Sequence, residues 1–167
     1  VIRGDYAVLK LNSSSTTPFG GSSTLNAGAT DNTVTYGASG SGMRVTTYYN
    51  LTISNPNGNW NGGASTINGT LTFGGTGNMG NVSGFTLNGN LAKTGSGTIT
   101  CNAARAVGGN VTVSSGVLYA QYGINVAGTT TISGTGTLQL GNQSSGTGTF
   151  TGDFSISAGT FNSSFGG

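Results

Sequence analysis

The chain has 167 residues, enough for one domain, and 33 of them are glycine while only 5% are charged. Its formal net charge of +2, from five scattered Lys and Arg residues, is too small to predict a nucleic-acid partner or an anionic membrane surface. The single cysteine excludes an intrachain disulfide, and no apolar run approaches the roughly 18 residues that predict insertion into a membrane.

Residues 1–45 predict an irregular N-terminal part. Ala7, Leu9 and Leu11 alternate with less apolar neighbours, which predicts a strand, and residues 13–21 predict a loop. Two interpretations stay open: this part caps a regular domain, or its strand pairs with a neighbouring subunit and assists assembly. Because the chain starts at Val1 and not at Met, we expect that a signal peptide or a longer N-terminal part has been removed, and that the protein is extracellular.

Residues 46–167 repeat about every 20 positions. The reference glycines of the repeat are spaced by 20, 20, 19 and 24 residues and are Gly69, Gly89, Gly109, Gly128 and Gly152. Glycines at fixed offsets predict left-handed bends between strands.

Apolar residues recur at fixed distances from these glycines and predict two buried columns. The first column contains Ile67, Leu71, Phe73, Leu87, Leu91, Val107, Val111, Val113, Val126, Ile132, Phe150, Phe154 and Ile156. The second contains Met79, Ile99, Leu118, Leu138 and Phe161, followed two residues later by Asn81, Cys101, Ala120, Leu140 and Ser163. Alternation at i and i+2 places such residues on one face of a strand, and stacked units bury them together.

The predicted fold is all-β: a parallel β-helix, or β-solenoid, with about 20 residues per coil and about six coils. We expect a right-handed helix, since the spacing of about 18 residues of many left-handed versions is absent. Lys93 occupies an apolar position, so a local bulge or an outward-directed side chain is expected there. Cys101 is expected to be a small buried hydrophobe.

The residue inventory predicts a non-catalytic protein without cofactor or metal. The chain has no His and no Glu, and its carboxylates are Asp5, Asp31 and Asp153, too far apart in sequence to suggest a general acid–base pair. The repeat lacks the recurrent Asp of calcium-binding solenoids, and the glycine-rich stretches lack the ending of a phosphate loop.

The stretches Asn32-Thr33-Val34-Thr35-Tyr36 and Thr47-Tyr48-Tyr49-Asn50-Leu51-Thr52-Ile53 resemble repeat units of large bacterial surface proteins. The family is that of adhesin-like and autotransporter-passenger-like β-helix proteins, and the resemblance covers most of residues 30–165. It implies an extracellular, structural or adhesive role and supplies no catalytic residues.

Two functional hypotheses follow. The C-terminus still lies inside the repeat, so we expect that copies of the chain stack head to tail into a fibre or that further repeats of a longer chain continue a stalk. The alternative is a binding module. Its outward Thr/Asn ladder resembles the ice-binding face of solenoid antifreeze proteins, and a surface glycan could contact Tyr48, Tyr49, Trp60, Tyr119 and Tyr122.

Overall fold

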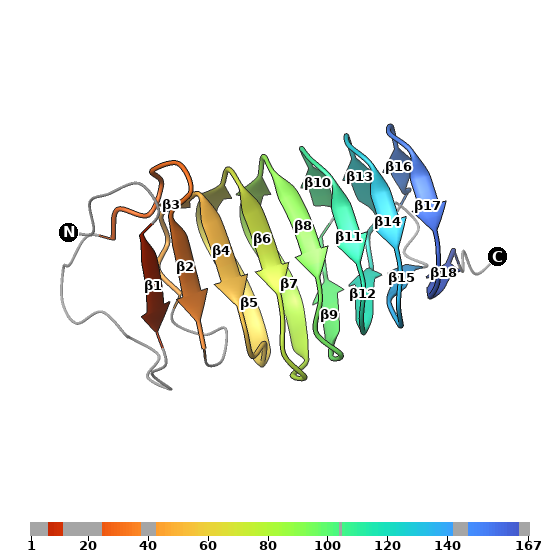
Figure 1. The fold of residues 1–167 in the computed structure, drawn as a ribbon, viewed down its shortest axis with the longest axis horizontal. Helices are drawn as coiled ribbons and strands as arrows, with labels where there is room; N and C mark the ends of the chain where they lie inside the picture. Colours follow the sequence, from red (N-terminus) through yellow and green to blue (C-terminus); the bar gives the residue numbers. More distant parts are fainter. Residues whose placement is uncertain (1–6, 12–24, 38–42, 104, 142–146, 164–167) are drawn as a thin grey trace.

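A computed structural model describes residues 7–11, 25–37, 43–103, 105–141 and 147–163, and the predicted 13–21 loop lies outside them. The described residues contain no helix, and their strands pair in parallel in stacked coils of about 20 residues. The predicted all-β parallel β-solenoid of about six turns is therefore confirmed. Figure 1 shows the coils side by side along the long axis.

One flat side of the solenoid is an eight-stranded sheet, here called the front sheet. Its strands, in order along the axis, are β1 (Val8–Leu11), β2 (Thr33–Tyr36), β4 (Asn50–Ile53), β6 (Thr70–Phe73), β8 (Asn90–Lys93), β11 (Val111–Val113), β14 (Thr130–Ile132) and β17 (Phe154–Ile156). Each strand contributes alternating residues to the interior, which is why the apolar residues recur two positions apart.

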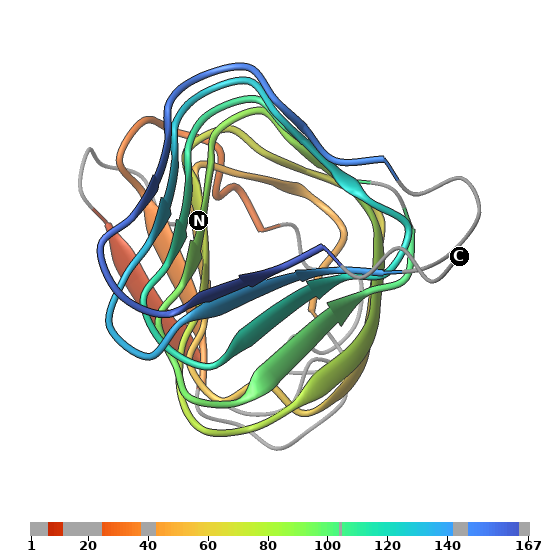
Figure 2. The same cartoon turned by 90° about the vertical axis from the view of Figure 1, so that its right-hand side faces the viewer.

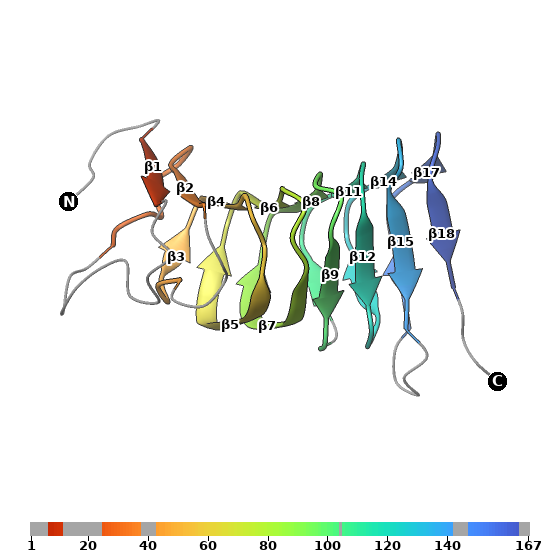
Figure 3. The same ribbon diagram turned by 90° about the horizontal axis from the view of Figure 1, so that it is seen from below.

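A ten-stranded sheet forms the other two sides, here called the second face, which faces the viewer in Figure 3, and the third face, which lies behind the front sheet in Figure 1. The second face holds β9 (Thr98–Cys101), β12 (Val117–Ala120), β15 (Thr137–Leu140) and β18 (Thr160–Asn162). The third face holds β3 (Thr47–Tyr48), β10 (Arg105–Val107), β13 (Ile124–Val126) and β16 (Thr149–Phe150). The long strand β7 (Met79–Leu87) pairs with β9 of the second face and with β10 of the third, so it joins the two faces into one sheet. The long strand β5 (Gly58–Ile67) pairs with β7 and with β3 of the third face.

The coils wind in a right-handed sense. In the end-on view of Figure 2 the chain runs down the front sheet on the left, along the second face below and back over the third face as it approaches the viewer. The interior enclosed by the three faces is filled by side chains, and it is the only hydrophobic core of the described residues.

The interior is built from columns of residues that lie in register in successive coils. In the front sheet Leu71, Leu91 and Val111 are Cα partners and are 0 to 3% exposed. Met79, Ile99, Leu118 and Leu138 form the corresponding column of the second face and are all buried. Ile67, Leu87, Val107 and Val126 form the column of the third face, also buried. Backbone pairing and apolar burial thus act along the same axis.

The second column contains a shift of one residue that the repeat spacing did not indicate. Val82, and not Asn81, is the Cα partner of Cys101, and the register shifts between Met79 and Val82. Asn81 instead adopts a φ of 48° and is exposed. β7 therefore holds one more residue than β9 between these two pairs, as a β-bulge does.

The N-terminal part extends the front sheet. β1 pairs in register with β2 of the same chain, where Leu9 and Leu11 are half-buried against the core and the Ala7 N–H donates to Oδ1 of Asn32 at 3.0 Å. Val8 faces outward and is 61% exposed.

Candidate functional surfaces

The outward residues of the front sheet form a regular ladder. One column is Thr35, Thr52, Thr72, Ala92, Thr112, Thr131 and Ser155, each the Cα partner of the next, and is called the threonine ladder below. Among the described residues, one side-chain hydrogen bond joins members of this column: the Ser155 hydroxyl donates to Thr131 Oγ1 at 3.4 Å. The other hydroxyls of this column face outward on a flat sheet.

The neighbouring outward column contains asparagines that hold the next coil. Oδ1 of Asn50 accepts the Thr70 N–H at 2.9 Å, and Oδ1 of Asn90 accepts the Asn110 N–H at 2.8 Å. Oδ1 of Asn110 accepts the Thr129 N–H, also at 2.8 Å. Each of these side-chain oxygens is therefore the hydrogen-bond acceptor for a backbone N–H of the next coil. This gives the asparagines a structural role that does not depend on any ligand.

The reference glycines allow neighbouring coils to approach closely, and they do not form the left-handed bends that the spacing predicted. None of the five has a positive φ. A Cβ on Gly69 would lie 2.5 Å from Oδ1 of Asn50, and one on Gly152 would lie 2.5 Å from the carbonyl oxygen of Gly128. Because coils stack at about 4.8 Å, the backbone of one coil lies where a side chain on the next would start. Close approach, not turn geometry, requires glycine here.

The last described coil presents an apolar surface to solvent. Phe154 and Ile156 occupy inward positions of β17 but are 38% and 49% exposed, because no described coil lies beyond them. Phe150 and Phe161 are partly buried, and the Phe154 ring lies 4.9 Å from that of Phe150 and 5.0 Å from that of Phe161. These four residues are called the terminal apolar surface, on the end that faces the viewer in Figure 2.

Lys93 is buried inside the solenoid, so the expected bulge or outward side chain is wrong. It sits in the regular strand β8 between Phe73 and Val113 and is 1% exposed. Its Nζ reaches a corner of the coil and donates to the carbonyl oxygens of Gly95 and Ser115. Burial lowers the pKa of Lys93 to about 8.

Cys101 is buried and lies in register with Ala120. Its burial raises the pKa of the thiol to about 11, because the thiolate loses hydration there. It packs as a small apolar side chain.

The aromatic residues considered for glycan binding do not form one surface. Tyr48 is fully buried, with its hydroxyl donating to the Arg44 carbonyl oxygen at 2.5 Å, and Trp60 is 3% exposed and stacked on Phe85. Tyr119 and Tyr122 are half-buried. Since two of these rings are inside the core, stacking a sugar on the whole set is excluded.

The remaining chemistry is sparse. Asp31 precedes β2 and Asp153 precedes β17, near opposite ends of the front sheet. Over the part of the chain that the structure describes, no group of three or more Asp or Cys residues could hold a metal ion, and no helix is long and apolar enough to cross a bilayer.

The fold and these surfaces define the chain as a parallel β-solenoid with a polar ladder on one side and an apolar terminal coil. No family model, curated protein or solved structure matches its sequence or fold.

Proposed function

We propose that the chain is an extracellular structural protein: a rigid β-solenoid stalk, or a subunit that stacks end to end into a surface fibre with an adhesive role. The observation that carries the proposal is the terminal apolar surface. Another parallel coil would cover the exposed Phe154 and Ile156, together with the edge of β17 that no described strand pairs with.

The opposite end of the front sheet offers a matching strand. β1 and β17 belong to the same parallel sheet and therefore run in the same direction. Leu9 and Leu11 face the interior with the same two-residue spacing as Phe154 and Ile156. Placing β1 of a second copy beside β17 would continue both the hydrogen-bonded ladder and the buried column.

Such a contact joins two different surfaces, so it does not close on itself. Repeated head-to-tail contacts of this kind produce a filament. In a longer chain, a further coil would make the same contacts with the terminal apolar surface and lengthen a stalk. Both forms rely on the same physical event, burial of apolar area at roughly 25 cal/mol per Å² together with strand pairing. The resemblance to surface adhesins supports the extracellular, adhesive part of the proposal.

The test is electron microscopy and light scattering of the purified chain over a range of concentrations. We expect straight particles of uniform width that lengthen with concentration. Ile156→Asp places a charge on the terminal apolar surface and should abolish lengthening. Ser155→Asp adds the same charge to the outward side of the same strand and should leave it unchanged. A wild-type chain that stays monomeric, or variants that behave alike, would contradict stacking, and bent particles would contradict a rigid stalk.

The threonine ladder supports a second candidate, an ice- or glycan-binding module. Its hydroxyls repeat at the coil spacing on a flat sheet. Ala92 and Ser155 interrupt the repeat, and the adjoining asparagines hold backbone groups. Dispersed monomers with thermal-hysteresis activity in the same preparation would favour this candidate over the fibre.

A further inference from the structure

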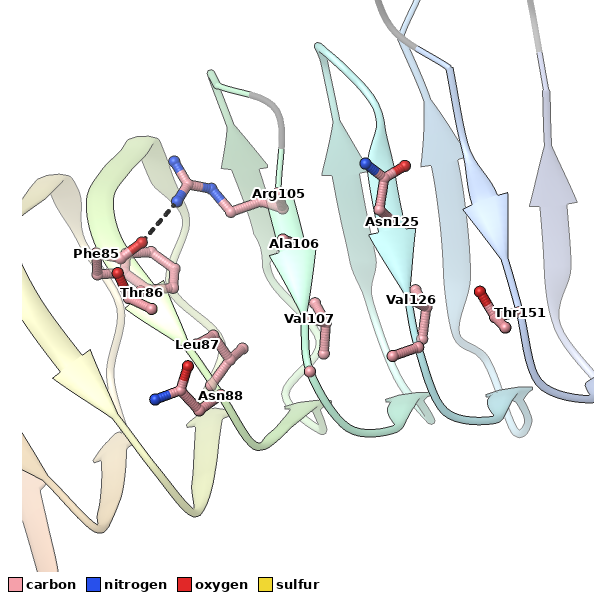
Figure 4. Close-up of a pocket in the computed structure, with 12 residues that line it drawn as sticks. Phe85, Thr86, Leu87, Asn88, Arg105, Ala106, Val107, Asn125, Val126 and Thr151 are labelled. Atoms are coloured by element: carbon pink, nitrogen blue, oxygen red, sulfur yellow. Dashed lines mark hydrogen bonds between the residues drawn. The ribbon is translucent and has the colours of Figure 1, made fainter.

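The third face is open between two of its coils. β5 and β7 pair there at Ser65↔Phe85, Thr66↔Thr86 and Ile67↔Leu87. β10 and β13 also pair at three positions, from Arg105↔Ile124 to Val107↔Val126. Between these pairs of strands, β7 and β10 pair only at Leu87↔Val107. A groove of about 510 Å³ lies over this gap (Figure 4).

Arg105 fills the gap with a cation. It follows Phe85 by one coil and is the Cα partner of Ile124, so it stands at an inward position between these two apolar residues. Its side chain is only 7% exposed. The guanidinium carbon lies 4.5 Å from the centre of the Phe85 ring, and Nη1 donates to the Phe85 carbonyl oxygen at 3.2 Å (Figure 4).

The hydrogen-bonding capacity of this guanidinium is largely unused. Its Nε is buried and has no hydrogen-bond partner among the described residues, and no described carboxylate pairs with it. Burial lowers the pKa of Arg105, because the guanidinium loses hydration there. A buried cation without a counter-ion favours an anion brought to it from outside, and a guanidinium is shaped to bind a carboxylate by two parallel hydrogen bonds.

The walls of the groove suit a hydroxylated molecule. Thr86 and Asn88 contribute a hydroxyl and an amide group from one coil, Asn125 an amide two coils further on and Thr151 a hydroxyl from the coil after that, all from exposed residues. Such groups both donate and accept, as sugar hydroxyls do. Ala106 and Ala127 are small outward residues among them and leave apolar surface for C–H groups. The volume lies within the range of about 300–1,000 Å³ typical of small-molecule sites.

We propose that this groove binds a carboxylate-bearing sugar, with the carboxylate on Arg105 and the hydroxyls against Asn88 and Asn125. The site is separate from the terminal apolar surface and from the threonine ladder, so it does not depend on stacking. A neutral sugar would leave the cation without an anion. A small carboxylate without hydroxyls would leave the polar walls unused.

The test is a titration of the ¹⁵N-labelled full chain with D-glucuronate, followed by NMR at constant ionic strength. We expect saturable shifts of the Arg105 Nε–H signal and of the Asn88 and Asn125 side-chain amides. D-glucose should give no saturable shift, and acetate should bind more weakly than glucuronate. Arg105→Gln should weaken glucuronate binding about tenfold or more, as expected for loss of a charge-assisted pair. Lys10→Gln is the matched control, because it removes the same charge from an exposed residue of β1.

A second pair of variants keeps the test decisive if Arg105→Gln fails to fold. Asn125→Ala removes an exposed side chain from the wall of the groove, and Gln139→Ala removes an outward amide from the second face. Only Asn125→Ala should lower the affinity for glucuronate. The proposal is overturned if the wild-type chain shows no saturable binding, if glucose or acetate binds as tightly as glucuronate, or if either control loses affinity as much as its partner.

Discussion

Lys93 shows how one side chain can occupy an apolar column without breaking it. Four methylene groups span the interior beside Phe73 and Val113, and the ammonium ends at the carbonyl oxygens of Gly95 and Ser115. The residue therefore keeps its strand regular while its charge leaves the apolar part of the core. Sequence alone could not predict this, because the acceptors are backbone atoms of a corner whose position depends on the fold.

The buried ammonium predicts a specific dependence of stability on pH. Below about pH 8 Lys93 is charged in both the folded and the unfolded chain, and burying this charge lowers the free energy of unfolding. Between about pH 8 and the ordinary pKa of 10.5, the unfolded chain binds the proton more tightly than the folded chain. The destabilisation therefore disappears as pH rises through this range. The lowered pKa corresponds to about 3 kcal/mol. The free energy of unfolding of Lys93→Met, measured relative to wild type by urea denaturation, should therefore fall by up to about 3 kcal/mol between pH 7 and pH 10.5.

Taking the difference between variant and wild type removes the opposing effect of Cys101. That thiol has its pKa raised from 9.0 to about 11, so it contributes stability that is lost as pH rises through this range in both proteins. Lys10→Met, which removes an exposed lysine, is the control. A difference for Lys93→Met that stays constant with pH would mean that burial does not disfavour the ammonium.

At the scale of the single coil, the glycine positions were predictable and their physical reason was not. The period of about 20 residues is visible because every coil must meet its neighbour in the same register. What glycine does there depends on which atoms of the preceding coil lie opposite, and this needs coordinates. The extra residue at Asn81 and the inward Arg105 were missed for a related reason: β7 shifts its register against β9, and β7 and β10 pair at only one position, so both residues lie where the pairing departs from the regular repeat.

Close approach predicts that two glycines of one coil respond differently to the same substitution. A Cβ on Gly89 would collide with the carbonyl oxygens of Gly69 and Asn68, whereas one on Gly74 would come no closer than 3.7 Å to any atom. Neither has a positive φ, so the two sites differ in space and not in backbone strain. Gly89→Ala should cost about 1–3 kcal/mol of unfolding free energy, the usual range for overpacking, and Gly74→Ala about 0. Equal effects in urea denaturation would contradict close approach as the reason for the reference glycines.

At the scale of the whole molecule, stability is the sum of contacts between neighbouring coils. Strands separated by one period pair in register along the front sheet, so each coil depends on the two beside it and on little else. This regularity made the fold predictable from one sequence. It also leaves function unspecified, because side chains that face outward are under few constraints from the core, and the groove beside Arg105 exists only where the repeat departs from its regular pairing.

The same additivity predicts that a complete coil can be removed while part of one cannot. Deleting residues 91–110 joins Asn90 to Val111, two positions that follow one another in every regular coil, and brings Val111 and Val113 beside Leu71 and Phe73. The shortened chain should fold cooperatively, with a β-sheet circular dichroism spectrum and a slightly smaller urea m value, since less surface is exposed on unfolding.

Deleting only residues 91–100 is the matched control. It joins Asn90 to Cys101, so a second-face segment enters the front sheet and every later column is displaced from its partner. That variant should lose its cooperative transition and be degraded rapidly by proteases; if it folds as well as the full-coil deletion, register between coils is not what determines this structure.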